Sequence, residues 1–166
     1  MATFALGTQA LYDFLHENPA VEFLPVDHVN DPRVIGEEEC FVSINATAEV
    51  DLVGQCASET VAGRYWSSSG GQADFARGSM YSPKGTAFVV LPSTAADGTI
   101  SRIRVSLTPG SMVTTLKNTV DHVVTEFGIA AMRGRSISQR AEALIAIAHP
   151  QFRDQLTAEA MQMGYL

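Results

Sequence analysis

The sequence lacks most of the features that mark a specialised class of protein. It has 2 cysteines, Cys40 and Cys56, whose spacing does not match that of a metal-binding pair, and its 4 histidines are scattered. The longest apolar runs, 87–91 and 143–148, are far shorter than the roughly 20 residues that cross a bilayer. No signal peptide is visible. We therefore expect a cytoplasmic protein that holds no metal and does not associate with a membrane.

Basic residues are also scarce. The chain has 11 Lys and Arg against 18 Asp and Glu, which gives a formal net charge of -7. A nucleic-acid-binding protein would carry a basic patch, so nucleic acid is not an expected partner. Hydrophobic residues make up 46% of the 166 residues, which excludes a disordered chain. The length predicts a single domain over residues 1–166.

The hydrophobic pattern predicts a chain in which strands are separated by loops and helices. Capping residues and prolines favour helix starts at Thr8, Asp31, Ser138 and His149, and a further helix is expected over 73–80. Apolar or alternating runs predict strands over 21–26, 40–45, 50–56, 86–91, 101–107 and 120–125. We thus predict an α/β fold with an open mixed or parallel sheet flanked by helices.

The stretch from Trp66 to Gly78 begins with a loop, residues 66–71, that we call the glycine loop. Its two adjacent glycines, Gly70 and Gly71, let the backbone approach a ligand because no Cβ stands in the way. Backbone N–H groups presented by such a loop can hold an anion or a developing oxyanion. Taken alone, however, a loop of this composition is most often a plain turn.

The glycine loop is one of several distinctive segments in the sequence. The other distinctive segments are 43–55, 91–98, 100–103, 122–128 and 140–153. In this order the segments resemble the C-terminal domain of the acetyl-CoA hydrolase/transferase family, which includes the 4-hydroxybutyrate, butyrate and succinate CoA-transferases. The resemblance runs from about Ala2 to about Glu159. It implies the open α/β sheet of class I CoA-transferases.

The resemblance also implies what these residues do not contain. In the family, a glutamate carries CoA as a glutamyl thioester, and it lies upstream of the segment that Phe4 to Phe14 resembles. We therefore expect the nucleophile and the N-terminal domain to lie outside this chain. The implied substrates are CoA or acyl-CoA and a short-chain carboxylate. The implied partners are an N-terminal CoA-transferase domain and further copies in a homo-oligomer.

Three residues are predicted to take part in the chemistry. By resemblance, Gly71 supplies a backbone N–H to the oxyanion hole and contacts CoA. Asn45, at the end of an expected strand, resembles the asparagine near the acyl group, although a strand-capping role is an equal alternative. Glu126 matches a supporting active-site glutamate. It ends the run 120–125, which we expect to be largely buried, so its carboxylate should be hydrogen-bonded or functional. The alternative is a strand-end glutamate in water.

The predicted CoA-contacting positions are Gly70, Gly71, Ala48 and Ala96. Many family members carry isoleucine where this chain has Ala48 and lysine where it has Ala96. Loss of that lysine should weaken the local attraction for phosphate. Arg102 and Arg104 are close in sequence and could compensate for the lost lysine, although an alternating strand favours their placement on its solvent face.

Two functions remain open at this stage. The first is the CoA-binding C-terminal domain of an enzyme that moves CoA between a short acyl-CoA and a carboxylate. The second is a non-catalytic module of the same fold that binds CoA or a partner chain. With the nucleophile outside these residues, the isolated chain is expected to show no turnover.

Overall fold

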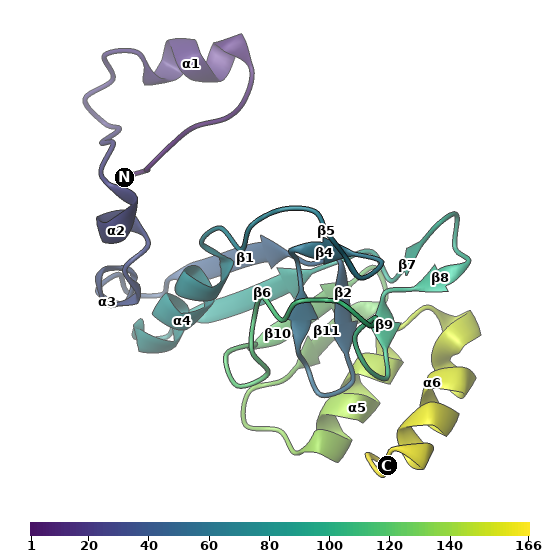
Figure 1. The fold of residues 1–166 in the computed structure, drawn as a ribbon. Helices are drawn as coiled ribbons and strands as arrows, with labels where there is room; N and C mark the ends of the chain where they lie inside the picture. The colour runs from purple at the N-terminus through teal and green to yellow at the C-terminus, as the bar shows by residue number, and fades with distance from the viewer.

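Three parallel strands from distant parts of the chain form the centre of the fold (Figure 1). In the computed structural model, which describes all 166 residues, β1 (Val42–Ala46) pairs with β6 (Thr86–Val90), and β6 pairs with β10 (His122–Thr125). A tight turn then brings β11 (Gly128–Ala131) back antiparallel to β10. The sheet is therefore mixed, with the order β1-β6-β10-β11, and the predicted α/β class is confirmed.

A smaller sheet packs beside the first. It has the order β3-β2-β9, from β2 (Glu49–Asp51), β3 (Cys56–Ala57) and β9 (Ile103–Arg104). Two short hairpins accompany it, formed by β4 (Thr60–Val61) with β5 (Arg64–Tyr65) and by β7 (Thr94–Ala95) with β8 (Ile100–Ser101).

The strands predicted over 50–56 and 101–107 are thus shorter than expected. In the first, the Asp51 carboxylate accepts hydrogen bonds from the N–H groups of Val53 and Gln55, and this closes a turn inside the apolar run. Burial is the main cause that raises the pKa of Asp51.

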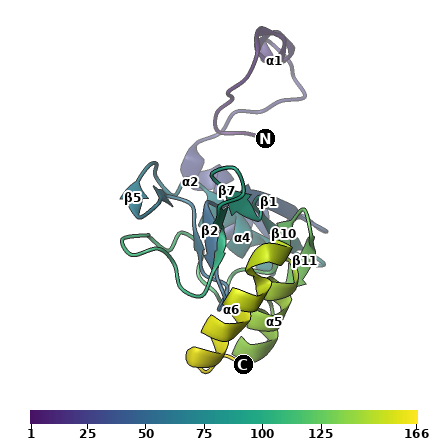
Figure 2. The same cartoon turned by 90° about the vertical axis from the view of Figure 1, so that its right-hand side faces the viewer.

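Helices α5 (Ile137–Ala146) and α6 (Pro150–Gln162) lie side by side at one end of the body (Figures 1 and 2). The sequence suggested Ser138 as the N-cap of α5, but the N-cap is Ser136. Its hydroxyl accepts from the N–H of Gln139 and the Gln139 side chain accepts from the Ser136 N–H, a reciprocal capping box. Pro150 begins α6 as predicted.

One face of the main sheet carries the core. Its side chains pack with the small sheet, α5 and α6 in a cluster that includes Val50, Leu52, Val89, Val123, Ala130, Leu144 and Leu156. The other face of the sheet is accessible to solvent, and on it Val42, Ile44 and Ile129 have exposed fractions of 54%, 66% and 62%. Helix α4 (Gln72–Tyr81) contacts β1 and β6.

A buried cation joins the connections around the core. Arg140, in α5, donates hydrogen bonds to the carbonyl oxygens of Val53 (3.1 Å), Lys117 (2.7 Å) and Arg135 (3.2 Å). Burial lowers the pKa of this guanidinium group. Because carbonyl oxygens satisfy several of its N–H groups, the charge is tolerated among apolar neighbours.

Residues 1–25 project away from the body, whereas the helix over 32–35 packs against α4 (Figures 1 and 2). The N-terminal residues form α1 (Gln9–Leu15), α2 (Val26–Val29) and α3 (Pro32–Ile35), and none of the first 34 residues is buried. Asp31 caps α3 as predicted, and its hydrogen bonds to Arg33 lower the pKa of Asp31 to about 2. The strand expected over 21–26 is reduced to an isolated bridge at Phe23, and Thr8 precedes α1 without a side-chain cap. No helix in the structure has the length and apolar character needed to cross a membrane.

Candidate functional site

The carboxyl ends of the three parallel strands surround a hollow, which we call the edge hollow. It has a volume of about 530 Å³ and is lined by Ala46, Thr47, Val90, Leu91, Pro92, Val124, Thr125 and Glu126. In open α/β sheets, ligands bind outside this edge because the strand ends leave a crevice there. The hollow is apolar except for its threonines and its single carboxylate. That carboxylate is the group in the hollow that can take part in a reaction.

The Glu126 carboxylate is held by one residue from the neighbouring strand end. Ser93 donates its N–H to one carboxylate oxygen at 2.8 Å and its hydroxyl to the other at 2.6 Å. Partial desolvation acts to raise the pKa of Glu126, but the hydrogen bonds from Ser93 lower it, and the pKa lies below its usual value. The run 120–125 is largely buried and the carboxylate is hydrogen-bonded, both as expected, while the Glu126 side chain itself lies beyond the end of β10 and is exposed. It is nevertheless oriented and ionised.

Asn45 lies one residue before the end of β1, in register with Val89 of β6. Its side-chain amide donates to the hydroxyl of Ser43 at 2.8 Å, two residues earlier on the same face of the strand. Because the residues that line the edge hollow on β1 are Ala46 and Thr47, the structure does not bring Asn45 together with Glu126 in one cavity.

A second hollow, which we call the arginine pocket, contains both alanines predicted to contact CoA. Ala48 and Ala96, which are 48 positions apart, line a pocket of about 470 Å³ with Arg102 and Arg104. Arg102 is not on a solvent face as expected: its guanidinium group donates to the carbonyl oxygens of Ala48 (2.9 Å) and Thr94 (3.2 Å). Here cations border the position where the family commonly has lysine.

The two arginines are not equally available. Arg104 lies 3.7 Å from the carboxylate of the buried Glu49, which also accepts hydrogen bonds from Thr108 and Ser111. Its charge is therefore partly balanced, whereas Arg102 is bonded to neutral carbonyl oxygens and keeps its full positive charge.

The loop that carries Ala96 has a left-handed backbone. Ala96 and Asp97 have φ values of 50° and 52°, and Gly98 follows at 85°. Residues with a Cβ are disfavoured there by roughly 1–2 kcal/mol each. The loop thus has a defined, strained conformation at a position that the sequence assigns to ligand contact.

The glycine loop leads into α4 and borders a third hollow of about 770 Å³, which we call the glycine-loop hollow. Gly71 is the N-cap of α4, and Gly70 before it has a φ of 54°, so Gly70 makes the turn. Neither N–H group donates to another atom of the protein. Thr3 and Phe4 line the same hollow. Two residues with unpaired N–H groups therefore line a hollow that the start of the chain also borders.

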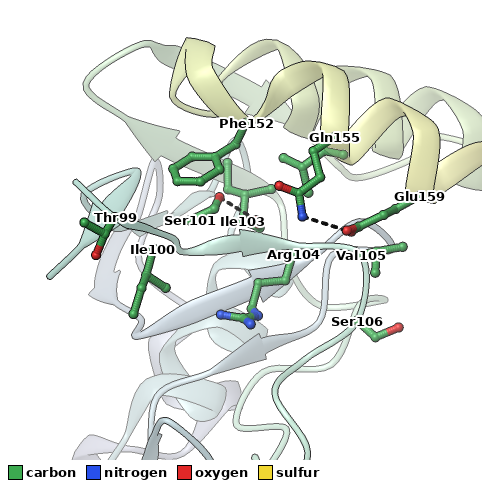
Figure 3. Close-up of a pocket in the computed structure, with 11 residues that line it drawn as sticks. Thr99, Ile100, Ser101, Ile103, Arg104, Val105, Ser106, Phe152, Gln155 and Glu159 are labelled. Carbon is green, nitrogen blue, oxygen red and sulfur yellow. Dashed lines mark hydrogen bonds between the residues drawn. The ribbon is translucent and has the colours of Figure 1, made fainter.

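The predicted residues accordingly fall into separate groups. Glu126 lines the edge hollow, Ala48 and Ala96 line the arginine pocket, and Gly70 and Gly71 line the glycine-loop hollow. A further cleft of about 460 Å³ contains none of them (Figure 3). In it, Phe152, Gln155 and Glu159 of α6 face the segment 99–106.

Sequence reasoning missed the residue that holds Glu126. Ser93 is fully buried, although serine is usually exposed, and it directly follows Pro92 at the end of a predicted strand. Its position at the carboxyl edge of the sheet was available from the sequence. Its partner was not, because 33 residues separate the two in the chain.

The fold of this chain closely matches those of two proteins of known structure. RipA from Yersinia pestis superposes with a TM-score of 0.93 at 45% identity, over 99% of this chain and 37% of that chain. The 4-hydroxybutyrate CoA-transferase from Porphyromonas gingivalis superposes with a TM-score of 0.78 at 44% identity, over 95% of this chain and 35% of that one.

Sequence comparison gives the family directly. The profile of the acetyl-CoA hydrolase/transferase C-terminal domain matches residues 7–160, and this chain belongs to that family. The succinyl-CoA:cyclohexane-1-carboxylate CoA transferase of Geobacter metallireducens is 57% identical over 99% of this chain and 38% of its own length. The 4-hydroxybutyrate coenzyme A transferase of Clostridium kluyveri is 48% identical over 96% of this chain and 37% of its own. The chain thus spans less than two fifths of these relatives, and the family expected from the sequence is confirmed.

Proposed function

We propose that this chain is the CoA-contacting C-terminal part of an enzyme that moves CoA between a short acyl-CoA and a carboxylate acceptor. One observation carries the proposal. Gly70 and Gly71, whose N–H groups have no acceptor within the chain, line the same hollow as Thr3 and Phe4. By the family resemblance, the glutamate nucleophile comes just upstream of this segment. It would therefore enter the site beside the glycine loop.

The proposed reaction needs a carboxylate nucleophile and fixed N–H donors. The glutamate oxygen attacks the acyl-CoA carbonyl, a C–O bond forms, the C–S bond breaks, and CoA leaves as a thiolate. The thiolate attacks the glutamyl carbonyl of the resulting anhydride and releases the first carboxylate. The acceptor carboxylate then repeats both steps in reverse. Each step passes through a tetrahedral oxyanion, and in this proposal the Gly71 N–H, which has no acceptor within the chain, stabilises it.

In this proposal Glu126 is a supporting acid and not the nucleophile. Its hydrogen bonds to Ser93 keep it ionised and fix its orientation at the edge hollow. Such a group can orient a substrate or cofactor, while an anion held this firmly by N–H and O–H donors is a weaker nucleophile. Asn45 is proposed to act near the acyl group.

The arginine pocket is proposed to receive the nucleotide end of CoA. Ala48 and Ala96 leave space between them, and Arg102 supplies a charge that no carboxylate pairs with. A phosphate group forms its strongest contacts with guanidinium donors, so Arg102 can take over part of the role of the family lysine.

The test combines the chain with the part it does not match. We expect the purified chain alone to bind CoA and to catalyse no CoA exchange. Joined to the N-terminal part of the Clostridium kluyveri 4-hydroxybutyrate coenzyme A transferase, it should exchange CoA between butyryl-CoA and acetate. Robust turnover by the chain alone would contradict the proposal. CoA binding without turnover in the joined, folded protein would favour the non-catalytic module instead.

A further inference from the structure

The N-terminal arm, which we define as residues 1–25, has the composition of a buried segment and the exposure of a surface. Phe4, Leu6, Phe14 and Phe23 are 76%, 85%, 59% and 48% exposed. The arm extends away from the sheets in both views (Figures 1 and 2). Helix α1 within it has no buried residue. Apolar side chains gathered in this way mark an interaction surface.

The arm is closed by an isolated β-bridge whose two sides are connected by a helix. The N–H of Ala2 donates to the carbonyl of Glu22 at 2.8 Å, and the N–H of Leu24 donates to the carbonyl of Ala2 at 2.9 Å. These bonds form a parallel bridge between Ala2 and Phe23, and α1 connects its two sides. Parallel pairs joined by a helix occur almost only inside larger, covered sheets. This pair has no sheet to belong to within the chain.

The arm also presents an unused strand edge. No N–H or C=O group of residues 3–6 takes part in a hydrogen bond. Exposure alternates along these residues, with Phe4 and Leu6 exposed and Thr3 and Ala5 half-buried, as in a strand. A row of unpaired backbone groups beside exposed apolar side chains is a template for pairing with another strand.

The arm has the same course in a longer chain. The superposition on RipA covers 99% of this chain, which includes the arm, but only 37% of the RipA chain. The remainder of that longer chain is available to contact the arm there. The arm therefore belongs to a fold that is shared with a larger molecule.

We propose that residues 2–6 of the arm add a strand to a parallel sheet in the N-terminal part of a family chain. That part is the occupant of the free edge, whether it is on the same polypeptide or on another. Phe4 and Leu6 then pack into it, and the strand bonds fix the register between the two parts. The inference rests on family membership and on the arm itself, and not on the proposed reaction.

The experiment measures binding and needs no turnover. The N-terminal part of the Clostridium kluyveri 4-hydroxybutyrate coenzyme A transferase is titrated with this chain, and Kd is compared among proline variants. Ala5→Pro removes an N–H that the isolated chain does not use, so the body should keep its thermal midpoint. We expect it to weaken binding by at least about fivefold, the scale of one lost hydrogen bond. Deleting residues 1–25 should abolish binding.

The matched control is Gln9→Pro. It places the same residue in the same arm at the first position of α1, where the N–H is also unbonded and proline is tolerated. Its Kd should stay within about twofold of the unchanged chain, because that N–H faces no partner strand. Equal binding by Ala5→Pro and the unchanged chain would overturn the proposal. So would a chain that binds only itself, since a second copy would then be the occupant. Binding without exchange activity would leave this inference standing while the proposed function failed.

Discussion

Ser93 and Glu126 join the ends of two neighbouring parallel strands through both oxygens of one carboxylate. The N–H and the hydroxyl of Ser93 each donate to a different oxygen, at 2.8 and 2.6 Å. Glu126 is exposed, so burial does not fix it, and the serine alone sets its orientation. The ends of β6 and β10 are consequently connected by a side chain as well as by the sheet.

Removing the serine hydroxyl should change the titration of Glu126. In Ser93→Ala the pKa of Glu126 should rise toward its ordinary value of 4.5, because one of two hydrogen bonds to the charged form is lost. The measurement is an NMR titration of the labelled glutamate carboxyl carbons. Ser106→Ala, at an exposed serine without a hydrogen bond, should leave that titration unchanged.

The same lowered pKa fixes a direction for stability. Because the folded-state pKa of Glu126 lies below its unfolded-state value, the interaction stabilises the fold above the unfolded-state pKa and is lost as pH falls through the folded-state pKa. Ser93→Ala should therefore lower the free energy of unfolding near neutral pH. In acid, the free energies of unfolding of the variant and the unchanged chain should become more similar. A difference that grows in acid would contradict this assignment.

Gly71→Val tests the oxyanion role. In the joined enzyme we expect turnover to fall by about 10²-fold, the scale of losing one oxyanion donor. A Cβ at Gly71 would also meet Asn30 Nδ2 at 2.5 Å and the Phe75 ring at 3.1 Å, so some loss of stability is expected. Turnover and thermal midpoint are therefore measured together.

Asn30→Ala separates the two effects because it removes the nearest of these contacts. If obstruction of the ligand causes the loss, Gly71→Val should stay inactive in the Asn30→Ala background. Recovery of turnover there would mean that the loop is only a turn. Ser68→Ala, in the same loop, should be nearly silent.

Ala96→Lys should strengthen CoA binding by about fivefold at low salt, the scale of one surface ion pair. The gain should shrink as ionic strength rises, because the new charge is screened. The measurement is calorimetric titration with CoA at two salt concentrations. Ala96→Gly is the matched control: it relieves the left-handed backbone at φ 50° and adds no charge, so affinity should not change. A lysine without effect at either salt would place the nucleotide elsewhere.

Ser136→Ala should destabilise the domain by about 1 kcal/mol, because it removes the N-cap of α5. Ser138→Ala should change stability by less than about 0.5 kcal/mol, since Ser138 lies inside the helix and makes no capping bond. Urea unfolding of the two variants gives both values. The opposite order would restore the capping role that the sequence suggested for Ser138.

The main elements were predictable because their signals are local. The apolar run at 86–91 became β6, and Asp31-Pro32 and His149-Pro150 began α3 and α6 as expected. The failures involve competition between local signals. Two serines two residues apart could each cap α5, and the choice depended on whether Gln139 could complete the box. The run at 50–56 looked continuous until the Asp51 carboxylate captured the backbone that follows it.

The candidate site was only half accessible from the sequence. Ala48 and Ala96 were assigned by resemblance, and the structure places them in one pocket. The position of Arg102 in that pocket was only the less favoured alternative, since an alternating pattern gives the face of a strand but not what covers it. Glu126 was noticed because it ends a buried run, and its hydrogen bonding was expected, but its partner Ser93 lies too far away in the chain to be predicted. The catalytic role of Glu126, like those of Asn45 and Gly71, stays a prediction.

Arg140 has a consequence for how the domain opens. Its acceptors, the carbonyls of Val53, Lys117 and Arg135, belong to three connections far apart in the chain. If one connection moved away alone, a buried charge would lose an acceptor, which is costly. The three should therefore open as one cooperative unit. Amide protons in β2, β10 and α5 would then exchange with solvent only when the whole domain unfolds, while those of the N-terminal arm exchange freely.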